Sequence, residues 1–258
     1  MGSDCAVVAL TRGYADEERY QSLIKRNVQI EKNLKDKDVE IILIHEGNIS
    51  DSQQEMITKK TPSLKLTFID MNSKPGKAFR KEKEGVQFDE ATAKIRLSYR
   101  HMCSFWFVDF WNFVEEYDYI IRIDEDCEID FDLDDRFEKL RDFVAIYGYW
   151  FLDLDFVTKG LNEFTVSFLE SNGVQCDPRD PWGPYTNIIG FNLKQLRENE
   201  LLFDYIESID ESNNIYRYRW GDLPLWGEVI CYLYGDNDHF LDEGIKYYHG
   251  SHRKNINA

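Results

Sequence analysis

Short apolar runs alternate with amphipathic stretches over the first third of the chain. Apolar runs of strand length occupy Cys5–Leu10, Val39–His45 and Leu64–Asp70. Between them, Asp16–Leu34 and Asp51–Lys60 carry apolar residues near helical spacing. Strand, helix, strand, helix, strand at this spacing predicts a parallel sheet with right-handed crossovers.

The rest of the chain continues this α/β pattern. A helix over about Ala91–Glu116 has aromatic residues on every side, which predicts burial between layers. We expect strands near Tyr117–Ile123, Tyr147–Leu154 and Asn187–Leu193. We expect helices near Asp134–Val144 and Thr158–Leu169, another from the end of the last strand to about Ile209, and a final one near Pro224–Tyr234. Asn72–Phe88 favours a solvated loop, with a lid over a site as the alternative. With no repeat or long linker, we expect one domain over residues 1–258.

Composition and charge narrow the possible functions. The chain has 258 residues and a net charge of −17, so nucleic acid and anionic lipid are unfavourable partners. A phosphorylated substrate would need local bases or a divalent cation. No run reaches the ~18 apolar residues of a spanning helix, and the start lacks a signal-peptide pattern. Five scattered cysteines without CxxC spacing favour a reducing compartment. We expect a soluble cytoplasmic protein, or one of the Golgi lumen if trimmed from a longer chain.

The strongest candidate for chemistry lies where an apolar strand ends in acids. Tyr119–Ile123 is followed at once by Asp124, Glu125 and Asp126. Ligands bind open α/β sheets at this edge, and residues i and i+2 of an extended segment point to the same side. Asp124 and Asp126 can therefore converge on a hard divalent cation that bridges to a diphosphate. Alternatively, they are ordinary loop acids after a strand.

Two later segments offer further candidates. In Arg217–Pro224, Gly221 permits a tight turn, and Asp222 is either a reactive carboxylate or a cap of the helix that Pro224 can begin. In Lys246–His252, the imidazole of His249 could complete a metal shell, or be a surface or core side chain. The sequence lacks GxGxxG after a strand, GxxxxGK[ST], HExxH and GxSxG, so dinucleotide, P-loop, zincin and α/β-hydrolase chemistry have no support.

Several segments in order resemble the fungal-type α-1,2-mannosyltransferases, glycosyltransferase family 15. They are Ala9–Arg12, Ser98–Cys103, Tyr119–Asp126, Arg219–Pro224 and Ile245–His249. The resemblance implies a GT-A fold, with a mixed, mostly parallel central sheet flanked by helices. It also implies a nucleotide-sugar donor, with GDP-mannose as the favoured one, and a glycan or glycoprotein acceptor. The reaction would require Mn²⁺ (or Mg²⁺) and would retain the configuration at the anomeric carbon.

The resemblance also implies roles for individual residues. The metal ligands would be Asp124, Asp126 and His249, and the catalytic carboxylate would be Asp222. The residues expected to bind the nucleotide sugar are Thr11, Arg12, Tyr99, Arg100, Asp124 and Trp220.

Two positions depart from the family pattern. Ser104 replaces an arginine, and Ile188 occupies the place of a proposed nucleophilic glutamate. An aliphatic side chain cannot attack carbon, so a front-face displacement is the economical route to retention. The loss also leaves a binding relic of the same fold as an alternative. A nucleotidyltransferase is less favoured because Leu10–Tyr14 is poor in glycine.

Overall fold

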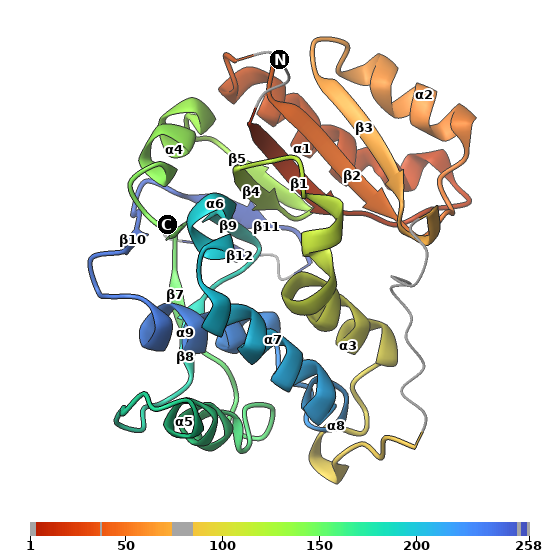
Figure 1. The fold of residues 1–258 in the computed structure, drawn as a ribbon. Helices are drawn as coiled ribbons and strands as arrows, with labels where there is room; N and C mark the ends of the chain where they lie inside the picture. Colours follow the sequence, from red (N-terminus) through yellow and green to blue (C-terminus); the bar gives the residue numbers. More distant parts are fainter. Residues whose placement is uncertain (1–3, 37, 74–84, 252–253, 257–258) are drawn as a thin grey trace.

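The computed structural model describes residues 4–36, 38–73, 85–251 and 254–256. Within them, a seven-stranded sheet forms the centre of the molecule (Figure 1). Its order is β10 (His239–Leu241), β6 (Ala145–Tyr147), β9 (Ile188–Asn192), β4 (Tyr119–Ile123), β1 (Cys5–Leu10), β2 (Glu40–His45) and β3 (Lys65–Asp70).

The sheet is mixed but mostly parallel, as predicted. β1 pairs in parallel with β2 and β4, and β2 pairs in parallel with β3. β9 runs antiparallel to both β4 and β6. The first three predicted strands therefore lie side by side, and their carboxyl ends share one edge with the end of β4.

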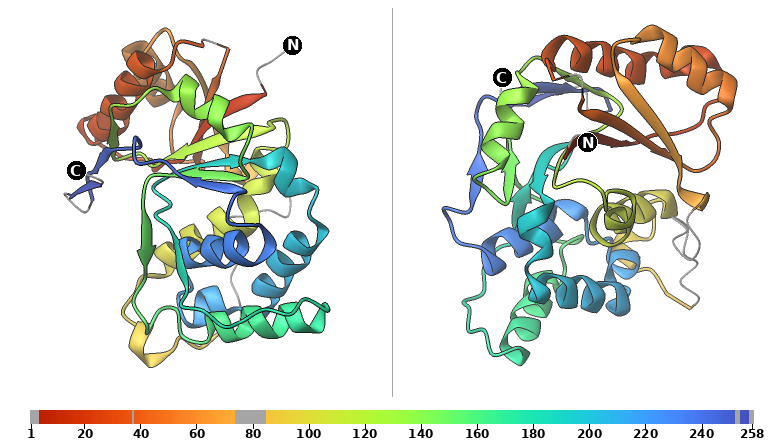
Figure 2. Two further views of the ribbon diagram at one scale, coloured as in Figure 1. Left: turned by 90° about the vertical axis from the view of Figure 1, so that its left-hand side faces the viewer. Right: turned by 45° about the horizontal axis from the view of Figure 1, so that its top comes forward.

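Alternate residues of the strands pack into two separate cores. In β1, Ala6 and Val8 join one cluster, while Cys5, Val7 and Ala9 join the other. The second cluster is covered by α1 (Gln21–Asn33), α2 (Asp51–Lys60) and α4 (Leu133–Leu140) (Figure 2). Helices on the opposite face are α3 (Leu97–Ser104), α7 (Glu200–Ser212) and α9 (Asp222–Leu233).

The long aromatic helix predicted over Ala91–Glu116 is wrong as a single element. After α3 the chain passes through a π-helical turn at Phe105–Asp109 and a 3₁₀ turn at Phe110–Phe113. Bulky rings pack on all sides of this segment, and Phe105, Phe107 and Phe110 are fully buried. A regular helix keeps one pitch throughout, whereas these turns of different width direct neighbouring rings into different layers. The predicted burial itself is confirmed.

The strand predicted over Tyr147–Leu154 is also wrong as one element. The chain breaks at Gly148 into β6 and β7 (Trp150–Leu152), and β7 pairs with β8 (Trp182–Pro184) in a separate small sheet. A Cβ at Gly148 would approach the backbone oxygen of Ile245 to 2.5 Å, so this crossing requires glycine. That contact is between segments far apart in the sequence.

The remaining elements complete the frame around the sheet edge. A second sheet, antiparallel, contains β5 (Cys127–Ile129), β11 (Tyr247–His249) and β12 (Lys254–Ile256). The other α-helices of the described residues are α5 (Leu161–Ser171), α6 (Leu193–Arg197) and α8 (Asn214–Arg217). Within the described ranges, no helix combines the length and apolarity needed to span a bilayer. Most of the loop predicted over Asn72–Phe88 lies outside the described residues.

Candidate active site

A buried arginine at the end of β4 connects two of the predicted site acids. The Nε of Arg122 lies 2.8 Å from Oδ1 of Asp124, and its Nη1 lies 2.5 Å from Oδ2 of Asp222. The guanidinium also rests on the ring of Trp106, 4.2 Å from its centroid. Sequence reasoning missed Arg122, although its i, i+2 relation to Asp124 places both side chains on one side of the strand.

The charge of Arg122 is set by its two carboxylate neighbours. Burial opposes ionisation of the guanidinium, but Asp124 and Asp222 outweigh burial and raise its pKa. The three side chains therefore form a group of one cation and two anions, in which Arg122 and Asp222 are buried and Asp124 is partly buried. Removal of the Arg122 guanidinium would leave two negatively charged carboxylates close together, with no positive charge between them.

Asp222 occupies the start of α9 without acting as its side-chain cap. Gly221 is the N-cap residue, and the helix begins at Asp222, two residues before the predicted start at Pro224. An acid in the first turn is favoured by the helix dipole. Residue Asp222 is 4% exposed, and its carboxylate accepts a hydrogen bond from Arg122. This contact directs it toward the strand-end acids.

The second sheet brings His249 to Asp126. The β5–β11 register pairs His249 with Cys127, and Nε2 of His249 lies 3.4 Å from Oδ1 of Asp126. The backbone N–H of Ser251 donates to Oδ2 of Asp126 at 2.8 Å, and its hydroxyl donates to the same oxygen. Burial raises the pKa of Asp126, but the hydrogen bonds from His249 and Ser251 outweigh it and hold the pKa well below its usual range.

These residues fit a divalent cation. Asp126, Cys127 and His249 each offer a ligand atom, and the three atoms lie within 4.8 Å of one another. Manganese and magnesium prefer oxygen, with imidazole nitrogen acceptable for manganese. Burial raises the pKa of Cys127 well above its ordinary value, and its soft sulfur suits these oxygen-preferring ions poorly. Asp126 and His249 are therefore the residues suited to hold the ion.

Asp124 lies beside this group but has other partners. Its oxygens accept hydrogen bonds from Arg122 and from Nδ2 of Asn187, the latter at 2.9 Å. The same Asn187 nitrogen lies 3.4 Å from Nε2 of His249. Asn187, which sequence reasoning also missed, thus connects Asp124 to the Asp126–His249 pair.

The loop after β1 is fixed to the acids by Glu125. Oε2 of Glu125 accepts hydrogen bonds from Oγ1 of Thr11 at 2.7 Å and from the backbone N–H of Arg12 at 3.2 Å. The hydroxyl of Tyr14 donates to Oε1 at 2.8 Å, and burial together with Glu125 raises the pKa of Tyr14 to about 12. The side chain of Arg12 is 78% exposed, and its Nε lies 3.8 Å from Oε1 of Glu125. Thr11 and Arg12 therefore border the strand-end acids.

Three other predicted nucleotide-sugar contacts differ in their surroundings. Tyr99 is 45% exposed, with the guanidinium of Arg219 over its ring. Arg100 is fully buried, and its guanidinium donates to the backbone oxygens of Tyr216 and Thr92. Trp220 is 1% exposed and donates to a backbone oxygen. The structure thus places Arg100 and Trp220 in the interior, where backbone oxygens accept their hydrogen bonds.

The position of the family's glutamate lies inside the sheet. Ile188 opens β9, pairs with Ile123 of β4 and is fully buried in the core. It contributes packing at this place and no nucleophile.

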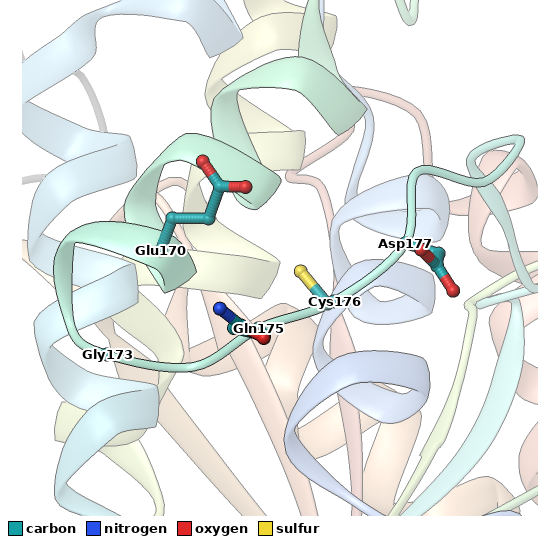
Figure 3. A pocket seen from close by; sticks show the side chains of 5 residues that line it. All are labelled: Glu170, Gly173, Gln175, Cys176 and Asp177. Atoms are coloured by element: carbon teal, nitrogen blue, oxygen red, sulfur yellow. The ribbon is translucent and has the colours of Figure 1, made fainter.

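A surface pocket elsewhere has no comparable chemistry. It lies at the C-terminal end of α5 and is lined by Glu170, Gly173, Gln175, Cys176 and Asp177 (Figure 3). Burial and the adjacent carboxylates raise the pKa of the Cys176 thiol, so it is a poor nucleophile.

Comparison with solved structures decides the fold. The mannosyltransferase Ktr4p from S. cerevisiae superposes with a TM-score of 0.79 and 16% identity, over 96% of this chain and 70% of that one. Core-mannan synthase A from Aspergillus fumigatus, in its Mn/GDP form, gives 0.78 and 18%, over 96% and 74%. The chain has the GT-A fold.

Sequence comparison supports the predicted resemblance to α-1,2-mannosyltransferases. This GT-A chain is 25% identical over 195 residues to the glycolipid 2-alpha-mannosyltransferase of Saccharomyces cerevisiae. The alignment covers 64% of this chain and 42% of that relative, so the chain spans less than half of its length. No protein-family model matches the chain. The resemblance predicted from the motifs is confirmed.

Proposed function

We propose that this protein is a metal-dependent, retaining mannosyltransferase that moves mannose from GDP-mannose to a hydroxyl of a glycan or glycoprotein acceptor. The observation that supports this best is the arrangement at the sheet edge. Asp222 is joined through Arg122 to Asp124, and the Asp126–His249 pair lies next to them. The mannosyltransferase names of the relatives and the Mn/GDP form of a structural neighbour support this donor.

In this proposal, residues 1–258 form one catalytic domain, and Asp126 and His249 hold a Mn²⁺ (or Mg²⁺) ion. When bound, such an ion supplies positive charge that stabilises the departing diphosphate. Among the described residues, Arg122 is already paired with two carboxylates, and the exposed Arg12, next to Thr11, has its Nε 3.8 Å from Oε1 of Glu125.

The chain's own residues have distinct tasks in this reaction. Arg12 presents a planar guanidinium to the nucleoside diphosphate. Asp222, oriented by Arg122, positions a sugar hydroxyl or accepts a proton near the anomeric carbon.

Retention in this proposal proceeds without an enzyme nucleophile, because Ile188 is a buried aliphatic side chain. The bond from the anomeric carbon to the phosphate oxygen breaks, and the acceptor oxygen bonds to that carbon on the same face. The acceptor proton passes to the departing phosphate oxygen, or to the carboxylate of Asp222 where that group acts as the base.

Incubation with single donors, with and without Mn²⁺, tests the proposal. We expect GDP release from GDP-mannose that needs Mn²⁺, and little or no release of nucleotide from UDP-glucose. A relic that only binds would show GDP affinity without release from any donor. Absence of both binding and release would contradict the proposal.

A further inference from the structure

A second, partly buried ion pair lies near the turn that precedes Asp222. Nη1 of Arg219 is 2.9 Å from Oδ2 of Asp153, and the two side chains are 11% and 16% exposed. Arg219 has a left-handed backbone, with φ of +68°. This conformation is costly for a residue with a side chain, and such residues cluster at functional sites.

Gly221 ties this pair to the site. A Cβ at residue 221 would lie 2.9 Å from Nη1 of Arg219 and 3.5 Å from Oδ2 of Asp153. Because Gly221 directly precedes Asp222, the ion pair packs against the turn that delivers the predicted catalytic carboxylate. The fold therefore places Asp153 and Arg219 as neighbours of the reaction centre.

The surroundings of the pair suit a sugar. The guanidinium of Arg219 lies 5.1 Å from the ring centroid of Tyr99, a half-exposed aromatic, and exposed Leu154 follows Asp153. Within the described residues, the buried Nε of Arg219 has no hydrogen-bond partner. The Asp153 carboxylate accepts from Arg219 and from the backbone of Leu154, which leaves acceptor sites unused.

We propose that Asp153 and Arg219, with Tyr99, form a subsite that binds the hydroxyls of a hexose beside Asp222. A hexose has neighbouring hydroxyls that both donate and accept, matching a carboxylate next to a guanidinium, and an apolar face that packs on an aromatic ring. This inference rests on the proposed function. The hexose is the sugar of the donor or that of the acceptor, and the test distinguishes them.

The variants Asp153→Asn and Arg219→Lys change the polar groups while keeping side-chain size or charge. Asp242→Asn and Arg136→Lys form a matched control, because that pair has similar exposure, 6% and 11%, and an Nε–Oδ2 distance of 3.2 Å. Thermal melting of all four variants shows which are folded. If Arg219→Lys fails to fold, Asp153→Asn alone carries the test.

Calorimetry with wild type and variants measures three ligands in the presence of Mn²⁺: GDP, GDP-mannose, and methyl α-mannoside added to the GDP-loaded protein. We expect GDP affinity to stay within about twofold, while one sugar measure falls at least ~10-fold, the effect of losing a charge-assisted hydrogen bond. Loss of methyl α-mannoside affinity assigns the acceptor sugar. Loss of the affinity difference between GDP-mannose and GDP assigns the donor sugar.

Control variants should leave all three affinities unchanged. Folded Asp153→Asn protein with unaltered affinity for both sugars would overturn the inference, as would equal losses in the control pair. Failure of wild type to bind GDP or GDP-mannose would instead contradict the proposed function.

Discussion

Arg122 is the residue that balances charge within the site. Its guanidinium is buried between Asp124 and Asp222, and each carboxylate lies within hydrogen-bond distance. A buried cation of this kind fixes the positions of its partners even where it adds little net stability. Two predictions follow from this arrangement, one for the cation and one for the anion of α9.

Replacing Arg122 with Met should destabilise the protein by about 3–5 kcal/mol, because the buried carboxylate of Asp222 and the partly buried one of Asp124 lose their shared partner. The free energy of unfolding in urea measures this loss. The double variant Arg122→Met with Asp222→Asn also removes one of the two negative charges that would repel each other. It should therefore recover part of the lost stability but no activity. A double variant no more stable than Arg122→Met would refute the charge-balance explanation.

Asp222→Asn should lower kcat at least ~10²-fold, the lower range for a positioned acid or base. The amide keeps an oxygen for Arg122 but loses the charge that the proposed reaction uses. Steady-state GDP release gives kcat, and GDP affinity serves as the control for an intact nucleotide site. Near-wild-type kcat would mean that Asp222 only pairs with Arg122 at the start of α9 and takes no part in the reaction.

At the scale of elements, the position of Asp222 depends on close packing of α9 against β8. A Cβ on Gly227 would overlap the carbonyl oxygen of Trp182 and lie 2.6 Å from Cα of Gly183. Glycine in a helix interior normally costs ~1 kcal/mol relative to alanine. Here the close backbone approach requires it, so helix and strand positions are coupled through this contact.

Gly227→Ala should therefore destabilise the protein by ~1–3 kcal/mol instead of stabilising it, as expected for overpacking. Because α9 begins at Asp222, kcat should fall as well. Gly235→Ala is the control, since the nearest atom to a new Cβ there is the end of the Asp238 side chain at 3.2 Å. Thermal denaturation compares the two, and a more stable Gly227→Ala protein would disprove the packing argument.

The sequence pattern predicted those strands and helices that depend on residues close together in the chain. The strands β1, β2 and β3 combine apolar runs with intervening amphipathic helices, so both their presence and their parallel order were predictable. The break at Gly148 was not, because it depends on the backbone of Ile245. The change from α-helix to a π-helical turn and then a 3₁₀ turn after Leu97 was missed for a similar reason, because the tertiary packing of the aromatic rings sets the local helical pitch.

The candidate site was predictable to a similar extent. The acids after β4 followed from strand geometry, whereas the approach of His249 to Asp126 depends on β5–β11 pairing and was expected only through the family resemblance. Arg122 was overlooked because a charged residue inside an apolar strand reveals its partners only in three dimensions. Arg100 was assigned to ligand, and the structure gives it backbone partners.

At the scale of the whole molecule, one buried carboxyl group should make stability fall as pH rises above 4.5. Glu228 in α9 is fully buried, and both its oxygens accept hydrogen bonds from Nδ2 of Asn162, at 3.2 and 2.9 Å. Burial raises its pKa from 4.5 to about 7, outweighing these hydrogen bonds. The folded protein therefore holds a proton that the unfolded chain releases between these values.

Because the folded pKa is the higher one, the contribution of Glu228 is fully present below pH 4.5 and is lost as pH rises toward 7. Glu228→Gln keeps the side-chain shape and removes this titration. The difference in unfolding free energy between Glu228→Gln and wild type should thus grow by up to about 3 kcal/mol between pH 4.5 and 7. Urea unfolding at several pH values measures it, and a difference independent of pH would contradict the raised pKa.

The overall charge also bears on the proposed reaction. A protein with net charge −17 repels an anionic nucleotide sugar at long range, so binding must depend on local positive charge. In this account, Arg12 and a cation at Asp126 and His249 provide that charge. GDP-mannose binding without a divalent cation should accordingly be weak.

The product formed from GDP-mannose and methyl α-mannoside, followed by proton NMR in the presence of Mn²⁺, tests the central claim most directly. The account predicts a new α-linked mannosyl anomeric signal and one GDP for each linkage, both abolished by EDTA and by Asp126→Ala. A β-linked product would contradict retention. Folded protein that binds GDP and Mn²⁺ but forms neither a new linkage nor free GDP would contradict mannosyl transfer itself.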